Sequence, residues 1–260
     1  MTALLAIPAW LLLLIAIVLF VGVACGGHLL VRRAFPGVDF TVHNGVGGVI
    51  LGIVGSLFSV TVAFIILIVW QEYDGTSLRV ATEFGAANDL WHTSVGLPEP
   101  VRDEVRRNLV AYGRLMISDE WPAMHEGGSS ERAEYLLTRT LEDVARLRAT
   151  SPSAEAAQTS AMQYLGMLHD SRTHRLDDNA SGVSAFEWMV LFIGAGVIIG
   201  ICYVLGLPNL RTQLLLTGAV AGMIAMMFVL VFELDYPFRG DLSVSPAPWT
   251  EFAAGKRADM

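Results

Sequence analysis

Charged side chains are scarce in this sequence. Only 16% of the 260 residues are Asp, Glu, Lys or Arg, whereas soluble proteins carry about 25%. Hydrophobic residues make up 53%, which is above the soluble norm of about 45–50%. This balance excludes an ordinary soluble globular protein and predicts a membrane protein.

Cysteine is also rare, and neither of the 2 cysteines is placed as a disulfide partner would be. Cys25 follows the first apolar run and Cys202 lies inside a later one. We interpret each of them as a small apolar residue packed in or beside a membrane span. No disulfide framework is expected, and the cysteines do not indicate a redox compartment.

Signatures of catalysis are missing as well. The sequence has no G-x-S-x-G, Walker or dinucleotide-binding glycine pattern, and its glycines lie within apolar runs where helix packing explains them. His169 and His174 are five residues apart, which is about 140° around a helix, so they do not share a face as zinc ligands would. We therefore expect no enzyme, no cofactor and no metal site.

Long apolar runs are what the sequence has in abundance. Four of them are near or above the roughly 20 residues that cross a bilayer as a helix, and they cover residues 3–24, 45–70, 186–205 and 214–232. Backbone groups in lipid must be hydrogen-bonded within their own segment, so each run is predicted to be helical. The first run is not interpreted as a cleaved signal, because no basic residue precedes it and its apolar part is too long.

The expected architecture is all-α, an integral membrane protein with two pairs of transmembrane helices and an intervening helical bundle. The predicted parts are a first helix pair (1–70), a soluble acidic helical domain (71–182), a second pair (183–233) and a C-terminal tail (234–260). The soluble helices each bury one apolar stripe, as in a bundle. Residues 72–178 hold 18 acidic and 11 basic side chains, which argues against nucleic acid as a partner.

Three local features of the soluble domain are also predicted. The second span continues beyond its apolar part, with a possible break at Gly75. A helix that opens near Pro100 is expected to end at Trp121-Pro122. Asp119 and Glu120 then belong to a loop and are expected to face solvent.

The tail after the fourth span has two interpretations. Pro237 stops the helix and Gly240 permits a turn. The aromatic residues Tyr236, Phe238 and Trp249 are typical of an interfacial anchor, whereas the charged residues around them would suit an ion-attracting vestibule.

Small residues follow one face of the second span. They form a candidate pore or helix-packing face made of Gly48, Gly52, Ser56, Ser59 and Ala63. Glycine pairs four residues apart allow helices to approach closely, and serine can bond back to its own helix, so packing alone explains the face. Passive conduction along weakly polar side chains is the functional interpretation. Charged residues are missing from the span interiors, which disfavours active transport.

Arginines near the span ends give a weak prediction of orientation in the plasma membrane. Arg32, Arg33 and Arg211 lie in the two short loops, 26–44 and 206–213. Basic residues in short loops favour the cytoplasmic side, which would leave the middle domain outside. Four arginines flank the spans on the other side of the membrane and reduce the difference in basic residues between the two sides: Arg79, Arg172, Arg175 and Arg239.

Four short motifs carry a family resemblance. They are VWQEYD at 69–74, GLPEPVR at 96–102, EWP at 120–122, and LDYPFRGD at 234–241 followed by VSP at 244–246. Together they resemble the bestrophin-like domain family of bacterial membrane proteins, a family defined as one of unknown function, and the resemblance covers nearly the whole chain. The family-motif positions are Trp70, Glu72, Tyr73, Asp74, Glu120, Trp121, Pro122, Asp235, Pro237, Phe238, Gly240 and Asp241.

The resemblance implies a channel. True bestrophins are pentameric anion channels with two pairs of spans around a helical soluble part, so it implies an oligomeric assembly that passes small ions, with anions favoured. Their pore neck uses bulky apolar residues of the second span, for which Phe58 and Phe64 are the candidate analogues. No match to the acidic calcium-binding cluster of bestrophins is found, so calcium gating is not implied.

Two matters stay open at this point. Bestrophins keep the soluble part in the cytosol, which is the reverse of the orientation that the arginines favour. The alternative function is a non-conducting membrane scaffold or signalling protein that binds a partner through its acidic helical domain. In either case the expected partners are the lipid bilayer and further copies of the chain.

Overall fold

The computed structural model describes residue 5 and residues 7–258, which are helices and their connections without any strand. Four helices are long and apolar enough to cross a membrane. They are α2 (Ala9–Ala34), α3 (Asn44–Thr93), α8 (Ala185–Val204) and α9 (Leu210–Leu234). The predicted all-α membrane protein with four spans is confirmed. The predicted start of the first span, at residue 3, lies outside the described residues.

The chain forms two compact units. The span unit comprises Met1–Gln71 and Val183–Tyr236, and the helical unit comprises Glu72–Gly182 and Pro237–Met260. Helix α3 contributes residues to both units and runs through Gly75 without interruption. The predicted break at Gly75 was wrong. A single glycine costs a helix only about 1 kcal/mol, and the turns on either side hold the helix together.

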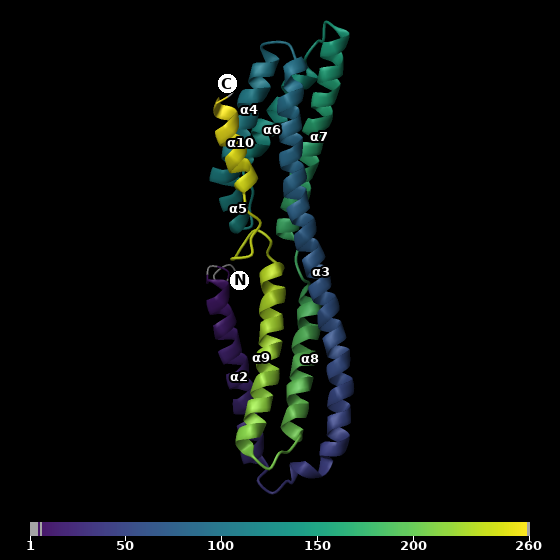
Figure 1. Cartoon of the computed structure of the whole chain (residues 1–260), viewed down its shortest axis with the longest axis vertical. Coiled ribbons are helices and arrows are strands. Elements are labelled where there is room, and N and C mark those ends of the chain that lie inside the picture. The colour runs from purple at the N-terminus through teal and green to yellow at the C-terminus, as the bar shows by residue number, and fades with distance from the viewer. Residues whose placement is uncertain (1–4, 6, 259–260) are drawn as a thin grey trace. The chain divides into compact units, whose positions relative to one another are not determined.

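In the span unit, α2 and α9 lie side by side along much of their length (Figure 1). A Cβ atom placed on Gly218 of α9 would lie 3.3 Å from Val21 of α2, and one on Gly222 would lie 3.7 Å from the same side chain. The rings of Phe20 and Phe228 meet edge to face at 5.6 Å between centroids. The small residues of α9 therefore serve close packing within the chain.

Helix α2 extends ten residues beyond its predicted end at residue 24, so a boundary prediction was wrong. His28 and Arg32 belong to the helix and not to a loop, and His28 is completely buried against the Tyr203 ring. Arg32 donates hydrogen bonds to the Leu205 carbonyl at 3.2 Å and to Gln213 Oε1 at 2.9 Å. Because Arg32 is hydrogen-bonded across helices and His28 packs against a ring of α8, the last turns can be helical although the sequence there is no longer apolar.

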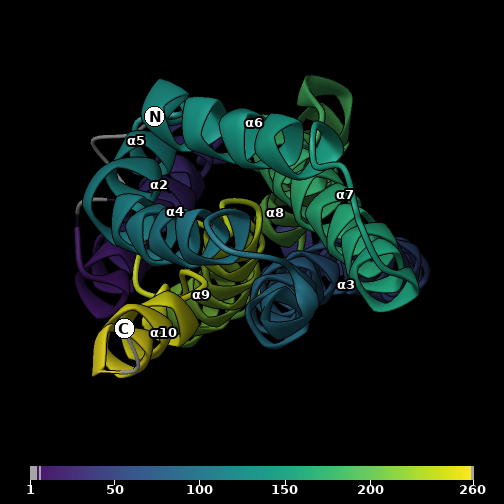
Figure 2. The same cartoon turned by 90° about the horizontal axis from the view of Figure 1, so that it is seen from above.

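The helical unit is a bundle built on the second half of α3. Figure 2 shows its other helices, which are α4 (Val101–Leu115), α5 (Trp121–His125), α6 (Glu131–Ala145), α7 (Pro152–Ala180) and α10 (Ala247–Ala258). A short 3-10 turn, η2 (Ser94–Gly96), follows α3, and a π-helical turn, η3 (Met116–Glu120), joins α4 to α5. The predicted apolar stripes supply the core: Val105, Leu109, Tyr112, Met116, Leu137, Val144, Ala161, Leu165 and Leu168.

Helix α10 is part of this core, which the prediction of a simple tail did not include. Trp249 and Phe252 are buried against α4, where Gly113 leaves room for both rings. Phe238 is fully buried as well. Interpreting Phe238 and Trp249 as aromatic anchors at the membrane surface was therefore wrong, because both fill the interior of the helical unit.

Candidate functional site

The small-residue face of α3 is exposed along the span unit. Gly48, Gly52, Ser56, Ser59 and Ala63 all lie at the surface. No atom of the described chain comes within 4 Å of a Cβ placed on Gly48 or on Gly52. This chain therefore does not use the face for its own helix packing, in contrast to the glycines of α9.

The face lies between two other sides of α3. Val62, Ile65 and Val69 are buried within the chain, and Val62 is three residues, or about 60°, from Ser59. Leu57 is 66% exposed, and it is two residues, or about 160°, away from Ser59 on a bulky apolar side. The exposed surface of α3 is thus divided into a narrow, weakly polar strip and a broad apolar one.

The two hydroxyls of the strip differ in their hydrogen bonds. Ser56 donates to the Gly52 carbonyl at 2.7 Å, within the same helix. Ser59 makes no hydrogen bond with any residue that the structure describes. Of the two, Ser59 has a proton available for a group outside the chain.

The two candidate neck aromatics lie on different faces. Phe58 contacts α8, where its ring occupies the space that a side chain at Gly194 would need. Phe64 is 61% exposed, and six residues place it about 120° from Phe58 around the helix. Phe58 therefore packs within its own chain and is half-buried, whereas Phe64 is the more exposed of the two.

Two of the family motifs meet in the helical unit, although they are more than a hundred residues apart in sequence. Trp121 donates from its indole nitrogen to the Val244 carbonyl at 3.0 Å, and its ring meets Phe238 edge to face at 5.9 Å. A hydrogen bond of 2.7 Å from the Val244 amide to the Pro237 carbonyl closes the turn that runs from Pro237 to Val244. Gly240 lies in this turn with φ of 74°, a conformation that favours glycine.

The segment around Trp121 differs from its prediction. Trp121-Pro122 begins α5 and does not end a helix. Proline is tolerated in the first turn of a helix, because its missing N–H would have no partner there. The helical path thus continues from α4 through η3 into α5, and this carries Glu120 into the core.

Glu120 is fully buried, so the prediction that it faces solvent was wrong. Its carboxylate accepts hydrogen bonds from Arg172 at 3.0 and 3.2 Å and from Arg175 at 3.2 Å. The Ser130 amide donates to it at 2.8 Å. A buried carboxylate requires such partners, since isolated burial of a charge is very costly.

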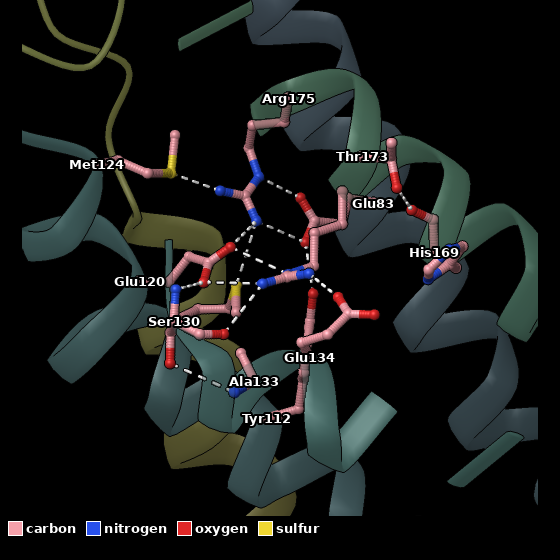
Figure 3. Close-up of polar contacts among 12 residues, drawn as sticks. Glu83, Tyr112, Glu120, Met124, Ser130, Ala133, Glu134, His169, Thr173 and Arg175 are labelled. Carbon is pink, nitrogen blue, oxygen red and sulfur yellow. Dashed lines mark hydrogen bonds and ion pairs between the residues drawn. The ribbon is translucent and has the colours of Figure 1, made fainter. Parts of the chain in front are cut away.

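Arg175 connects this carboxylate to α3 (Figure 3). It donates to both oxygens of Glu83, at 2.6 and 3.1 Å, and both side chains are completely buried. Although burial alone would lower the pKa of Arg175, the Glu83 carboxylate raises it, so the guanidinium stays charged. The Arg175 guanidinium also lies 4.9 Å from the centroid of the Trp121 ring.

Tyr112 completes the arrangement by donating its hydroxyl to Glu83 at 2.7 Å. Burial, and after it the charge of Glu83, raises the pKa of the Tyr112 phenol well above its usual range, so it remains a donor. We define the ionic cluster as Glu83, Glu120, Arg172 and Arg175. Its members are two buried acids and two buried bases that link α3, η3 and α7, and Arg172 also pairs with the half-buried Glu134 of α6.

The remaining motif positions are spread over both units. Asp235 is buried in the span unit and accepts a hydrogen bond of 2.5 Å from the Val183 amide. Tyr73 packs against the core of the helical unit. Four further positions of the motifs VWQEYD and LDYPFRGD lie at the surface, namely Trp70, Glu72, Asp74 and Asp241. The structure therefore brings the third and fourth motifs together around Trp121 and leaves most of VWQEYD exposed.

Comparison with known proteins agrees with this fold. A family model described as a bestrophin-like domain matches residues 18–249. A bacterial bestrophin homologue from Klebsiella pneumoniae, with a single substitution, has a TM-score of 0.69 at 14% identity, covering 95% of this chain and 99% of that one. A second variant of it has a TM-score of 0.67 at 12% identity, covering 96% and 97%.

Another solved structure, titled as a membrane protein variant, has a TM-score of 0.70 at 13% identity and covers 95% of this chain and 97% of its own. No curated protein matches the chain in sequence. At these identities the solved structures establish the fold, and the family model spans most of the sequence. The chain belongs to the bestrophin-like domain family.

Proposed function

We propose that the protein is an oligomeric membrane channel for small ions, with anions favoured, and that α3 lines the ion path. The observation that carries the proposal is the exposed strip of Gly52, Ser56, Ser59 and Ala63 in a member of the bestrophin-like family. Gly48, at one end of the strip, borders a cavity of the span unit and is left out of the path.

The strip suits a path for ions for two reasons. Conduction requires binding that is strong enough for entry and weak enough for exit, and glycine, alanine and serine provide such weak sites. The unbonded hydroxyl of Ser59 can donate a hydrogen bond to a passing anion. The strip lies on the outside of the chain, so several copies must surround the path, and small residues allow their helices to approach closely.

Flux from liposomes tests this proposal. Purified protein in vesicles is expected to release chloride, and Ser59→Trp is expected to reduce the release by roughly tenfold or more, because a bulky ring fills a path lined by small residues. Leu57→Trp is the matched control on the other side of α3 and should leave the release near that of the unmodified protein. A stable oligomer without flux of any small ion would overturn the proposal in favour of a non-conducting scaffold.

Orientation is tested by cysteine labelling in intact cells, with Cys25 and Cys202 replaced by alanine. The arginine count predicts that a cysteine at Pro208, in a short loop, is protected from a membrane-impermeant reagent. A cysteine at Glu126, in the helical unit, would then be labelled. The reverse pattern would contradict the arginine count and match the arrangement that the family resemblance implies.

A further inference from the structure

A cavity of about 330 Å³ lies in the span unit among α3, α8 and α9. Its size falls at the lower end of the range for small-molecule sites, about 300–1,000 Å³. The walls are largely apolar and include Leu51, Leu216 and Val220. Polar residues join the lining as well, among them Asn44, Gln213 and Thr217.

Among the polar residues that line the cavity, Thr217 has a hydroxyl without a hydrogen-bond partner in the described part of the chain. The residue is only 3% exposed, it lines the cavity, and its hydroxyl makes no hydrogen bond to any described residue. A hydroxyl that lines a largely apolar cavity gains a hydrogen bond when a polar group of a ligand lies beside it.

Gln213 connects the cavity to a cation. Its side chain is buried and accepts hydrogen bonds from the Leu207 amide at 2.7 Å and from Arg32 Nη2 at 2.9 Å. The hydrogen bonds of Arg32 use Nε and Nη2, so the N–H groups of Nη1 remain available. Arg32 is half-buried. Arg32 does not line the cavity, but its guanidinium is hydrogen-bonded to a residue that does, and a guanidinium is suited to a phosphate group.

We propose that this cavity holds one acyl chain of a membrane phospholipid, with its ester group near Thr217 and its phosphate near Arg32. The apolar walls accommodate the hydrocarbon, and the polar residues accommodate the end of the lipid that carries oxygen. An apolar side chain of a second copy would pack against the apolar walls, but it would not accept hydrogen bonds from the Nη1 group of Arg32. The inference does not depend on ion conduction.

A neighbouring hollow supplies a matched control. It has a volume of about 310 Å³ and lies between α3 and α8, where its lining is entirely apolar and includes Gly200 and Val204. It lacks any counterpart of Thr217 or Gln213. Annular lipid would occupy both hollows alike, whereas a specific site would retain lipid in the first one.

The test uses the full-length protein in vesicles of phosphatidylethanolamine and phosphatidylglycerol with a trace of phosphatidylglycerol that carries a diazirine in mid-chain. After irradiation, labelled positions are mapped by mass spectrometry. Labelling is expected to concentrate at the half-buried Leu51 and Val220 of the cavity over the exposed Leu215. Gly48→Phe, which fills the cavity, should reduce labelling at the cavity residues by roughly fivefold or more, because a filled cavity excludes the acyl chain of the lipid. Gly200→Phe should leave it unchanged.

Three results would overturn the proposal. The first is labelling at the cavity equal to that at Leu215 in the unmodified protein, which would indicate bulk lipid and does not depend on any variant folding. Labelling that Gly48→Phe leaves unchanged would place the lipid elsewhere. The third is an absence of labelling at Leu51 and Val220 while Leu215 is labelled, which would show that something other than lipid, such as a neighbouring subunit, fills the cavity.

Discussion

Replacing Arg175 by methionine is expected to lower the free energy of unfolding of the helical unit by about 3–5 kcal/mol. The substitution leaves the buried carboxylates of Glu83 and Glu120 without their shared partner. Removing one member of a buried ion pair is costly because the remaining charge stays desolvated. The measurement is the midpoint of thermal unfolding of the purified protein in detergent, which should fall by on the order of 10 °C.

Two further variants give this prediction its controls. Arg146 is 75% exposed and pairs with Glu142 on one helix face, so Arg146→Met should change stability by less than about 1 kcal/mol. The double variant Arg175→Met with Glu83→Gln restores the balance of charge and should be more stable than Arg175→Met alone. Equal losses in Arg175→Met and Arg146→Met would show that the ionic cluster does not hold the helices together.

The spans could be predicted from the sequence because lipid imposes one simple requirement. A run of apolar residues must satisfy its own backbone and therefore forms a helix. The end of α2 was missed because His28 and Arg32 are polar, and their partners come from α8, α9 and the loop between them. A boundary decided by contacts between helices leaves no signal in the periodicity of one helix.

The ionic cluster could not be predicted for the same reason. Glu120 looks like a solvent-facing acid, since its partners Arg172 and Arg175 lie more than fifty residues further along the chain. The π-helical turn η3, which turns the residue inward, has no recognised sequence pattern. A usable signal was the family motif EWP itself, because Glu120 precedes a tryptophan, a residue type that is highly buried on average.

The glycine pairs show what can and cannot be predicted about the candidate site. The same spacing occurs in α3, α8 and α9, and it predicts that another helix can approach each of them closely. Gly218 and Gly222 meet α2 in the same chain, whereas Gly48 and Gly52 meet no described side chain. The spacing is identical in both cases, so only the fold distinguishes internal packing from an exposed strip.

Modification of a cysteine at Ser59 is expected to have the largest effect on ion flux. The variant is Ser59→Cys with Cys25 and Cys202 replaced by alanine, and the reagent is a negatively charged methanethiosulfonate. If α3 lines a water-filled path, the thiol reacts, and a fixed negative charge opposes anions within a narrow opening. Leu57→Cys, exposed on the opposite side of α3, provides the comparison, since a group that faces lipid or another helix leaves the path open.

The decisive measurement is therefore chloride flux from liposomes before and after this modification. We expect the flux of Ser59→Cys to fall by roughly tenfold when the reagent is added, because the charge lies in the path. The flux of Leu57→Cys is expected to stay within measurement error. Unchanged flux in a fully modified Ser59→Cys protein, or a thiol at 59 that the reagent never reaches, would contradict the claim that this face of α3 lines the ion path.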